Sequence, residues 1–208
     1  MGATWGDKLA DVPERRDTVA RDVPFHGAKT QVHVDRLVLP GADGPEEVSR
    51  EYLVHPGAAV ALALDEAGRV LMVHQYRHAV GERLWELPAG VRDEEGEPPV
   101  RTAMRELEEE AGHRAERWYE LADFYPSPGF SSERIQVFLG RGVSAVPEEE
   151  QSFVRLHEEA DLHPEWVPLE EAVRAVSEGR VRNGATAIGV LAAAAAERDG
   201  FASLRPAE

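Results

Sequence analysis

The chain has 208 residues, of which 39 are acidic and 23 basic, and it contains no cysteine. A net charge of −16 repels phosphate backbones and anionic lipids, so we expect neither nucleic acid nor a membrane surface as a partner. The lack of cysteine excludes disulfides, thiol catalysis and zinc–thiolate sites, and it is typical of a cytoplasmic protein. We expect no signal peptide, and the longest apolar run, residues 185–196, is too short to span a bilayer.

The N-terminal part of the chain is predicted to form an extension to a larger domain. Residues 1–22 mix charges with proline and glycine and lack a clean period, so we expect them to be weakly ordered. Strands predicted at residues 30–39 and 47–55 flank a turn-rich segment and form a β-hairpin. Because a hairpin with a free edge is only marginally stable, we expect it to pair with the core or with another subunit. The expected division is an extension over residues 1–55 and a main domain over residues 56–208.

The main domain is predicted to combine short strands with helices. Apolar runs bounded by turn signals predict strands at residues 58–64, 70–76, 84–87, 119–125, 135–139 and 166–169. Patterns that end at a glycine predict helices over residues 170–178 and 186–198. Residues 143–164 are acidic without a strong period, and we expect a mobile loop there. A mixed sheet with these two helices on one face and a further helix on the other gives an α/β/α sandwich.

The further helix is predicted over residues 98–112 and has two different faces. Two prolines suit its first turn, and Gly112 suits a left-handed cap at its end. Between them, apolar residues recur at i, i+3, i+4, i+7 and i+11, which is the pattern of a core-facing stripe. Glu106, Glu109 and Glu110 fall on a separate arc about 100° wide. Like charges at this spacing repel one another, so we expect a cation over the glutamate face.

The three glutamates alone leave other interpretations open. Acidic runs on helices usually mark a solvated face, and this chain is acidic throughout. A di-iron carboxylate site would use the Glu-x-x-His pattern at Glu110 and His113. That site needs a second copy of the pattern, which the chain lacks, and Gly112 ends the helix before His113 can share the face. The spacing of the whole segment is more restrictive than any of its parts.

That spacing resembles the Nudix box, the loop–helix signature of enzymes that hydrolyse nucleoside diphosphates linked to another moiety. The matching residues are Gly90, Glu97, Arg105-Glu106-Leu107, Glu109-Glu110 and Gly112. Two departures are present, because six residues rather than five separate Gly90 from Glu97 and because His113 replaces the usual terminal aliphatic residue. The extra residue lies in the loop before the helix, so it need not disturb the glutamate face.

Hydrolysis of a diphosphate needs cations to neutralise its charge, an attacking water and a base. Carboxylates are the hard oxygen ligands that Mg²⁺ takes, with Mn²⁺ as the alternative. The resemblance implies four metal ligands, Glu106, Glu109, Glu110 and the carbonyl of Ala89. It also makes Glu109 a catalytic candidate and pairs Glu97 with Arg105, which fixes the loop against the helix. Gly90 and Gly112 are implied to be structural.

The base is expected in the acidic loop, within residues 157–161. On the residues alone, a solvated acidic run is the open alternative. ADP-ribose pyrophosphatases of the Nudix family carry the proton acceptor on the corresponding loop. Aligning the Glu-Glu-Ala-Asp segment puts that acceptor on Glu159, with Glu158 next.

Two further segments resemble ADP-ribose pyrophosphatases and imply four substrate contacts. Pro128 stands beyond the box where those enzymes carry a marker proline, and Phe130 follows it closely. The segments around Arg77 and Glu86 are similar to the same enzymes. The guanidinium of Arg77 can donate bidentately to a phosphate or ribose, and an exposed arginine without a role is the open alternative.

The resemblance implies Mg²⁺-dependent hydrolysis of the pyrophosphate bond of ADP-ribose to AMP and ribose 5-phosphate. It also implies a homodimer whose N-terminal strands are exchanged between subunits. Another nucleoside diphosphate sugar is the alternative substrate. A catalytically silent Nudix-type nucleotide sensor is the alternative class of protein, and the complete glutamate set argues against it, since a pure binder has little reason to keep three repelling acids.

Overall fold

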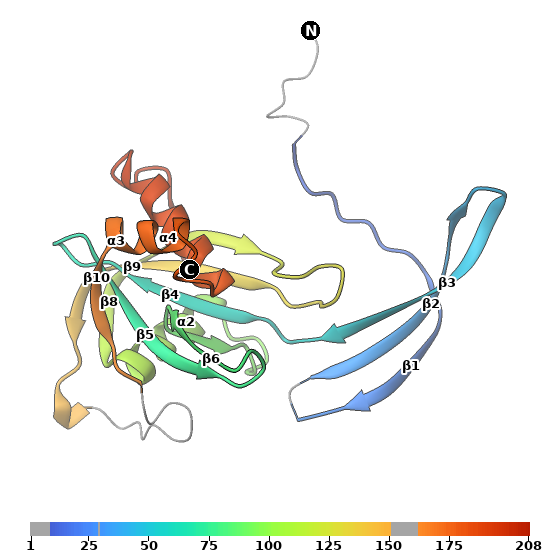
Figure 1. The fold of residues 1–208 in the computed structure, drawn as a ribbon, viewed down its shortest axis with the longest axis horizontal. Helices are drawn as coiled ribbons and strands as arrows, with labels where there is room; N and C mark the ends of the chain where they lie inside the picture. Colours follow the sequence, from blue (N-terminus) through green and yellow to red (C-terminus); the bar gives the residue numbers. More distant parts are fainter. Residues whose placement is uncertain (1–8, 29, 151–161) are drawn as a thin grey trace, which may run out of the picture. The chain divides into compact units, whose positions relative to one another are not determined.

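The computed structural model describes residues 9–28, 30–150 and 162–208, and the chain divides into two compact units, Met1–Val54 and His55–Glu208 (Figure 1). The first unit is an antiparallel sheet in the order β1-β2-β3. Its strands are β1 (Thr18–His26), β2 (Gln31–Gly41) and β3 (Gly44–Val54). The strands β2 and β3 pair without interruption up to their connecting turn, which confirms the predicted N-terminal hairpin.

Strand β1 begins inside a segment that the sequence predicted to be weakly ordered, and that prediction was wrong for residues 18–22. The strand pairs with β2 from Thr18 opposite Leu37 to His26 opposite Gln31. The order of residues 18–22 comes from contacts across the sheet, to residues more than ten positions away, and a local sequence pattern does not contain such contacts.

A cluster of polar side chains holds this sheet together. In the described residues of the first unit no apolar side chain is fully buried, whereas Asp35 is 5% exposed. The carboxylate of Asp35 accepts hydrogen bonds from Nε and Nη2 of Arg21 at 2.6 and 2.8 Å and from the hydroxyl of Tyr52 at 3.0 Å. The hydrogen bonds from Arg21 outweigh burial and lower the pKa of Asp35 to about 2. Burial, together with Asp35, raises the pKa of Tyr52.

The second unit contains two sheets. The larger, in the order β11-β8-β9-β4-β7, consists of β4 (Ala58–Ala63), β7 (Ala89–Val91), β8 (His113–Phe124), β9 (Ile135–Ala145) and β11 (Arg205–Pro206). The smaller, in the order β10-β5-β6, consists of β5 (Arg69–Arg77), β6 (Glu82–Glu86) and β10 (Glu165–Pro168). Because β4 and β9 are parallel and the other pairs antiparallel, the larger sheet is mixed.

Helices cover both faces of the larger sheet (Figure 1). They are α2 (Pro99–Ala111), α3 (Leu169–Ser177) and α4 (Gly184–Glu197), with a short 3-10 turn, η1 (Glu148–Glu150). Along β4 the side chains alternate, so that Ala59 and Ala61 pack with α2, whereas Val60 and Leu62 pack with α3 and α4. This confirms the predicted α/β/α sandwich. No helix in the described ranges is long and apolar enough to cross a membrane.

Helix α2 follows the sequence prediction at both ends, whereas the neighbouring strands do not. Pro98 caps its start, and Gly112 ends it in the left-handed conformation with φ of 64°. The strands β8 and β9 are longer than predicted, because His113 pairs with Ala145 far beyond the apolar runs. The predicted loop over residues 143–164 therefore begins later, and its residues 151–161 lie outside the described part of the chain. The short strands β7 and β11 were not predicted.

Candidate active site

The loop at β7 and the helix α2 meet through two buried glutamates. The backbone N–H of Ala89 donates to Oε2 of Glu110 at 2.9 Å. The carboxylate of Glu106 lies over Gly90, where the Cβ of any other residue would be 1.9 Å from Oε1. Glu110 and Glu106 are 5% and 9% exposed, and Glu109, on the same arc of the helix, is half-buried. The structure thus brings the predicted ligands Ala89, Glu106 and Glu110 together.

Arg105 holds two of the glutamates on this face. Its Nη1 donates to Oε1 of Glu106 at 2.7 Å and to Oε2 of Glu109 at 3.1 Å. Burial disfavours the charge of Arg105, but the negative charges of Glu106 and Glu109 outweigh it and raise the pKa of the guanidinium. This guanidinium is one cation that contacts the glutamate face, and a metal ion at the same face stays a prediction.

Glu97 makes a different contact from the one that the resemblance implied. The hydroxyl of Thr102 donates to Oε2 of Glu97 at 2.7 Å, while Arg105 turns to the glutamates of its own helix. The charge of Glu97 reaches Arg105 only as a weaker, longer-range contribution to its raised pKa. The loop is therefore fixed to the helix through Thr102, a fully buried residue of the first turns of α2.

The donor chemistry of this face fits a divalent cation. Three carboxylates gather on this face, and two of them are buried, where an opposite charge is worth more than in water. Oxygen donors of this kind suit Mg²⁺ or Mn²⁺. In the described ranges, no three acidic or histidine side chains already converge as a preformed metal site. Arg105 instead bridges Glu106 and Glu109, so their carboxylates would turn from Arg105 toward the metal on binding it.

Two of the predicted substrate residues contact each other. Nε and Nη2 of Arg77 donate to the two carboxylate oxygens of Glu86 at 2.9 and 2.7 Å. Glu86 is buried at the end of β6, whereas the guanidinium of Arg77 is partly exposed at the end of β5. A bidentate pair of this geometry fixes the orientation of the arginine. Direct contact of either residue with substrate stays a prediction.

Two further predicted substrate residues, Pro128 and Phe130, lie on a loop. Both residues are exposed between β8 and β9, and Phe130 is 61% exposed. Their role in substrate binding stays a prediction. The predicted base Glu159 and its neighbour Glu158 lie outside the described residues, so the position of the base is untested.

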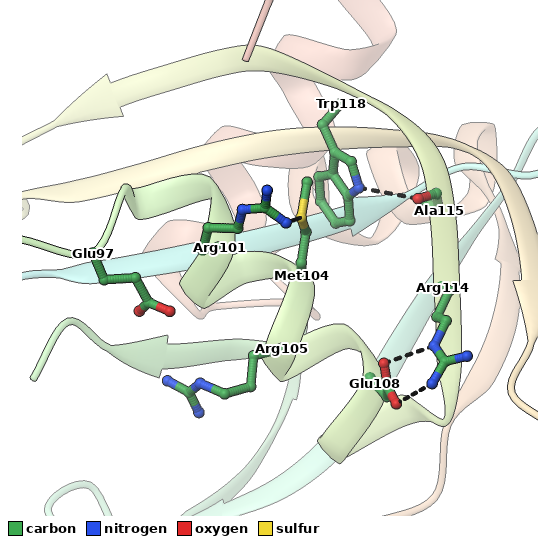
Figure 2. Close-up of a pocket in the computed structure, with 8 residues that line it drawn as sticks. All are labelled: Glu97, Arg101, Met104, Arg105, Glu108, Arg114, Ala115 and Trp118. Atoms are coloured by element: carbon green, nitrogen blue, oxygen red, sulfur yellow. Dashed lines mark hydrogen bonds and ion pairs between the residues drawn. The ribbon is translucent and has the colours of Figure 1, made fainter. Parts of the chain in front are cut away.

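A pocket of about 390 Å³ flanks α2 on another side, and the sequence did not predict it (Figure 2). Its lining residues are Glu97, Arg101, Met104, Arg105, Glu108, Arg114, Ala115 and Trp118. Two of these residues form an ion pair, in which Arg114 donates to both carboxylate oxygens of Glu108 at 2.8 and 2.6 Å and lowers the pKa of Glu108. The helical spacing of Arg101, Arg105 and Glu108 was the available signal. The pocket shares Arg105 with the glutamate face.

An α/β/α sandwich in which a helix presents glutamates to a glycine loop is the architecture of the Nudix hydrolases. Residues 54–185 match the family model described as NUDIX domain, and the chain belongs to this family. It is therefore a Nudix hydrolase, as the sequence predicted.

Named relatives agree with this assignment. The chain is similar to the ADP-ribose pyrophosphatase of Mycobacterium tuberculosis, with 42% identity over 190 residues that cover 91% of this chain and 88% of the relative. It is also similar to the ADP-ribose pyrophosphatase of Bacillus subtilis, with 35% identity over 173 residues that cover 83% and 89%. A crystal structure of an ADP compounds hydrolase shares the fold, with a TM-score of 0.69, 14% identity and coverage of 92% of this chain and 99% of that chain.

Proposed function

We propose that this Nudix hydrolase cleaves the pyrophosphate bond of ADP-ribose to AMP and ribose 5-phosphate in a Mg²⁺-dependent reaction. The observation that carries the proposal is the glutamate face of α2 packed against Ala89 and Gly90. The choice of ADP-ribose as the substrate is supported by the similarity, over most of the chain, to two proteins named ADP-ribose pyrophosphatase.

The residues of the site are proposed to have three different roles in hydrolysis: metal ligand, base and positioning residue. Glu106, Glu109, Glu110 and the carbonyl of Ala89 would hold the metal. When bound, Mg²⁺ neutralises the charge of the diphosphate and polarises its oxygens, and Mn²⁺ can supply the same chemistry. Water attacks one phosphorus, the bridging P–O bond breaks toward the other phosphate, and Glu159 accepts the proton of the water. Arg105 keeps the carboxylates of Glu106 and Glu109 oriented before the metal binds.

The substrate contacts follow from the two segments outside the box. Arg77, oriented by the buried Glu86, donates to a phosphate or ribose oxygen of the substrate. Phe130 and Pro128 supply exposed apolar surface on the loop between β8 and β9 for a part of the ligand. These assignments are proposals, supported by exposure and by the bidentate geometry of the arginine.

The first unit is proposed to form a homodimer. Several apolar side chains on its strands are exposed, with Val19 57%, Val23 44%, Phe25 55% and Val38 47% exposed. A sheet without a buried apolar core is not expected to be stable alone, so its apolar side chains need a partner surface. A second copy of the chain is the partner that the resemblance implies. A cytoplasmic location also stays a proposal, supported by the lack of cysteine.

An assay of the purified full-length chain tests the proposed reaction. Incubation with ADP-ribose should give AMP and ribose 5-phosphate, identified by chromatography and mass, only when Mg²⁺ or Mn²⁺ is added. A parallel panel of other nucleoside diphosphate sugars measures the preference through kcat/KM. A higher kcat/KM for another compound would replace ADP-ribose as the substrate, and no metal-dependent turnover of any compound would end the proposal.

A further inference from the structure

Arg92 continues the strand that carries the loop of the site. In the pairing of β7 with β4, Gly90 lies opposite Ala59 and Val91 lies opposite Ala58. The backbone N–H of Arg92 donates to the carbonyl of Gly57 at 3.1 Å, so the ladder extends one residue further. The backbone of Arg92 is therefore held in the same ladder as β7, the strand whose residues Ala89 and Gly90 contact Glu110 and Glu106.

The register places the side chain of Arg92 on the same face of the sheet as the glutamates. Side chains two residues apart in a strand point to the same face. The Cβ direction of Gly90 meets the carboxylate of Glu106, and Ala59, opposite Gly90, packs in the cluster that contains α2. A Cβ on Gly57, opposite Arg92, would lie 3.8 Å from Cδ of Arg92. The side chain of Arg92 thus leaves the sheet on the face that α2 covers, two residues along the strand from Gly90, which the carboxylate of Glu106 contacts.

Among the described residues, Arg92 forms no ion pair with a carboxylate. Two other arginines of the second unit pair with carboxylates, Arg105 with Glu106 and Glu109, and Arg134 with Asp123. Arg92 is half-buried, and its Nε is buried and donates to no acceptor among the described residues. No carboxylate in the described ranges pairs with its guanidinium. A buried donor without an acceptor is unfavourable, so an acceptor from outside the chain would stabilise this arrangement.

We propose that Arg92 binds a phosphate oxygen of the diphosphate in the substrate. The planar guanidinium donates in a fork that matches phosphate oxygens, and a fixed cation beside an acidic face helps that face accept an anionic ligand. The inference rests on the proposed function for the position of the substrate, but it concerns the diphosphate, which all nucleoside diphosphate compounds share. The rival interpretation is that the aliphatic stem of Arg92 only fills space beside Gly57.

Steady-state kinetics of Arg92→Met and Arg92→Lys, at saturating Mg²⁺, separate the two interpretations. A charge-assisted hydrogen bond in the ground state predicts a rise in KM for ADP-ribose of roughly 10- to 100-fold in Arg92→Met, with kcat changed by less than about threefold. Arg92→Lys keeps the charge without the fork and should give an intermediate KM. If Arg92→Met fails to fold, the KM of Arg92→Lys decides. A KM within about twofold of the wild type in the folded variant overturns the inference.

Arg141→Met is the matched control. Nε of Arg141 is also buried without an acceptor among the described residues, but its guanidinium lies 5.0 Å from the ring centroid of Phe201, which packs with the cluster of α3 and α4. Loss of this guanidinium should leave KM unchanged, so an equal rise in both variants would overturn the inference.

Calorimetric binding of inorganic pyrophosphate in the presence of Mg²⁺ separates the role of Arg92 from the identity of the substrate. Wild-type protein should bind at least about tenfold more tightly than Arg92→Met. This result would stand even if ADP-ribose were not hydrolysed, in which case only the proposed function fails. Equal affinities, or no binding by the wild type, would overturn the inference about Arg92.

Discussion

The carboxylate of Glu106 occupies space that only a glycine at position 90 leaves open. A Cβ on Gly90 would lie 1.9 Å from Oε1 of Glu106 and 2.2 Å from its Cδ. Both distances are far below van der Waals contact, so the leading glycine of the box and its first helical glutamate are one structural unit. The glycine is required here for close approach, and its own backbone conformation is ordinary.

Gly90→Ala should therefore separate stability from activity. The clashing atoms are the far end of a flexible side chain, so Glu106 can swing away, and the fold should survive with a modest fall in melting temperature. The swing removes Glu106 from the metal face, and we expect kcat/KM to fall at least about tenfold. Gly184→Ala is the control, because a Cβ there meets nothing within 4 Å and alanine favours a helix. Full activity of Gly90→Ala in the metal-dependent assay would contradict this account.

Glu110→Gln should abolish turnover without unfolding the protein. Glutamine retains a side-chain oxygen to accept the N–H of Ala89, and loss of one negative charge relieves repulsion on the helix. We expect a fall in kcat of at least about a hundredfold, because a metal ligand is lost. Circular dichroism melts alongside the assay would show whether the fold is kept.

Glu108→Gln is the matched control on the same helix. Glu108 lies away from the glutamate face and accepts two hydrogen bonds from Arg114 in a partly exposed pair. Its loss should lower the melting temperature slightly and leave kcat unchanged. Equal losses of activity in Glu108→Gln and Glu110→Gln would show that the assignment of the face is wrong.

The sequence predicted the helix of this site, but it did not predict which side chains pair with each other. The apolar period, the prolines and the glycine cap of α2 are properties of neighbouring residues, and the prediction of the helix was confirmed at both ends. The partners of charged groups are properties of the fold. Glu97 bonds Thr102 rather than Arg105, and Arg77 bonds Glu86 across a strand pair, and neither choice is encoded in a local spacing.

The bounds of several strands were also missed, because they too depend on contacts between distant residues. β1 has no clean apolar alternation, and the pair of Arg21 with Asp35, fourteen residues apart in the chain, brings it to β2. The ends of β8 and β9 were missed because polar residues there pair across the sheet, as His113 does with Ala145. Tertiary pairing overrides weak local propensity in all these cases.

Asp35→Asn should remove an acid-sensitive part of the stability of the first unit. Arg21 lowers the pKa of Asp35 from 3.8 to about 2, so the folded state favours the ionised carboxylate. The stabilisation is complete above about pH 4 and disappears as the pH falls toward 2, because the carboxylate then becomes protonated in both states. The difference in urea midpoint between wild type and variant should therefore be largest near neutral pH and shrink below about pH 4. Asp43→Asn, in the exposed turn after β2, should show no such trend.

Deletion of residues 1–54 should abolish dimerisation and most activity. The deletion stops before His55, because the backbone N–H of His55 donates to Oγ of Ser132 and its Nδ1 accepts from the N–H of Gly57, both within the second unit. The exposed apolar side chains of the first unit are the proposed partner surface. Light scattering gives the oligomeric state, and a fully active monomer would end this proposal.

Glu159→Gln should lower kcat strongly while it leaves the affinities for substrate and metal nearly intact. If Glu159 accepts the proton of the attacking water, the loss should be about 10²- to 10⁴-fold, the usual contribution of a placed proton acceptor. Glu106→Gln, a change in a metal ligand, should instead raise the Mg²⁺ concentration needed for half-maximal rate. Titrations of rate against Mg²⁺ for the two variants therefore distinguish a base from a ligand.

Glu158→Gln is the internal control for the position of the base. Adjacent residues in an extended loop point in opposite directions, so Glu158 and Glu159 are not both expected to reach the attacking water. A larger loss of kcat in Glu158→Gln would shift the assignment by one residue. If neither substitution changes kcat, the base lies outside this loop, and Glu109 becomes the first candidate, because it is the less buried carboxylate of the glutamate face and shares Arg105 with Glu106.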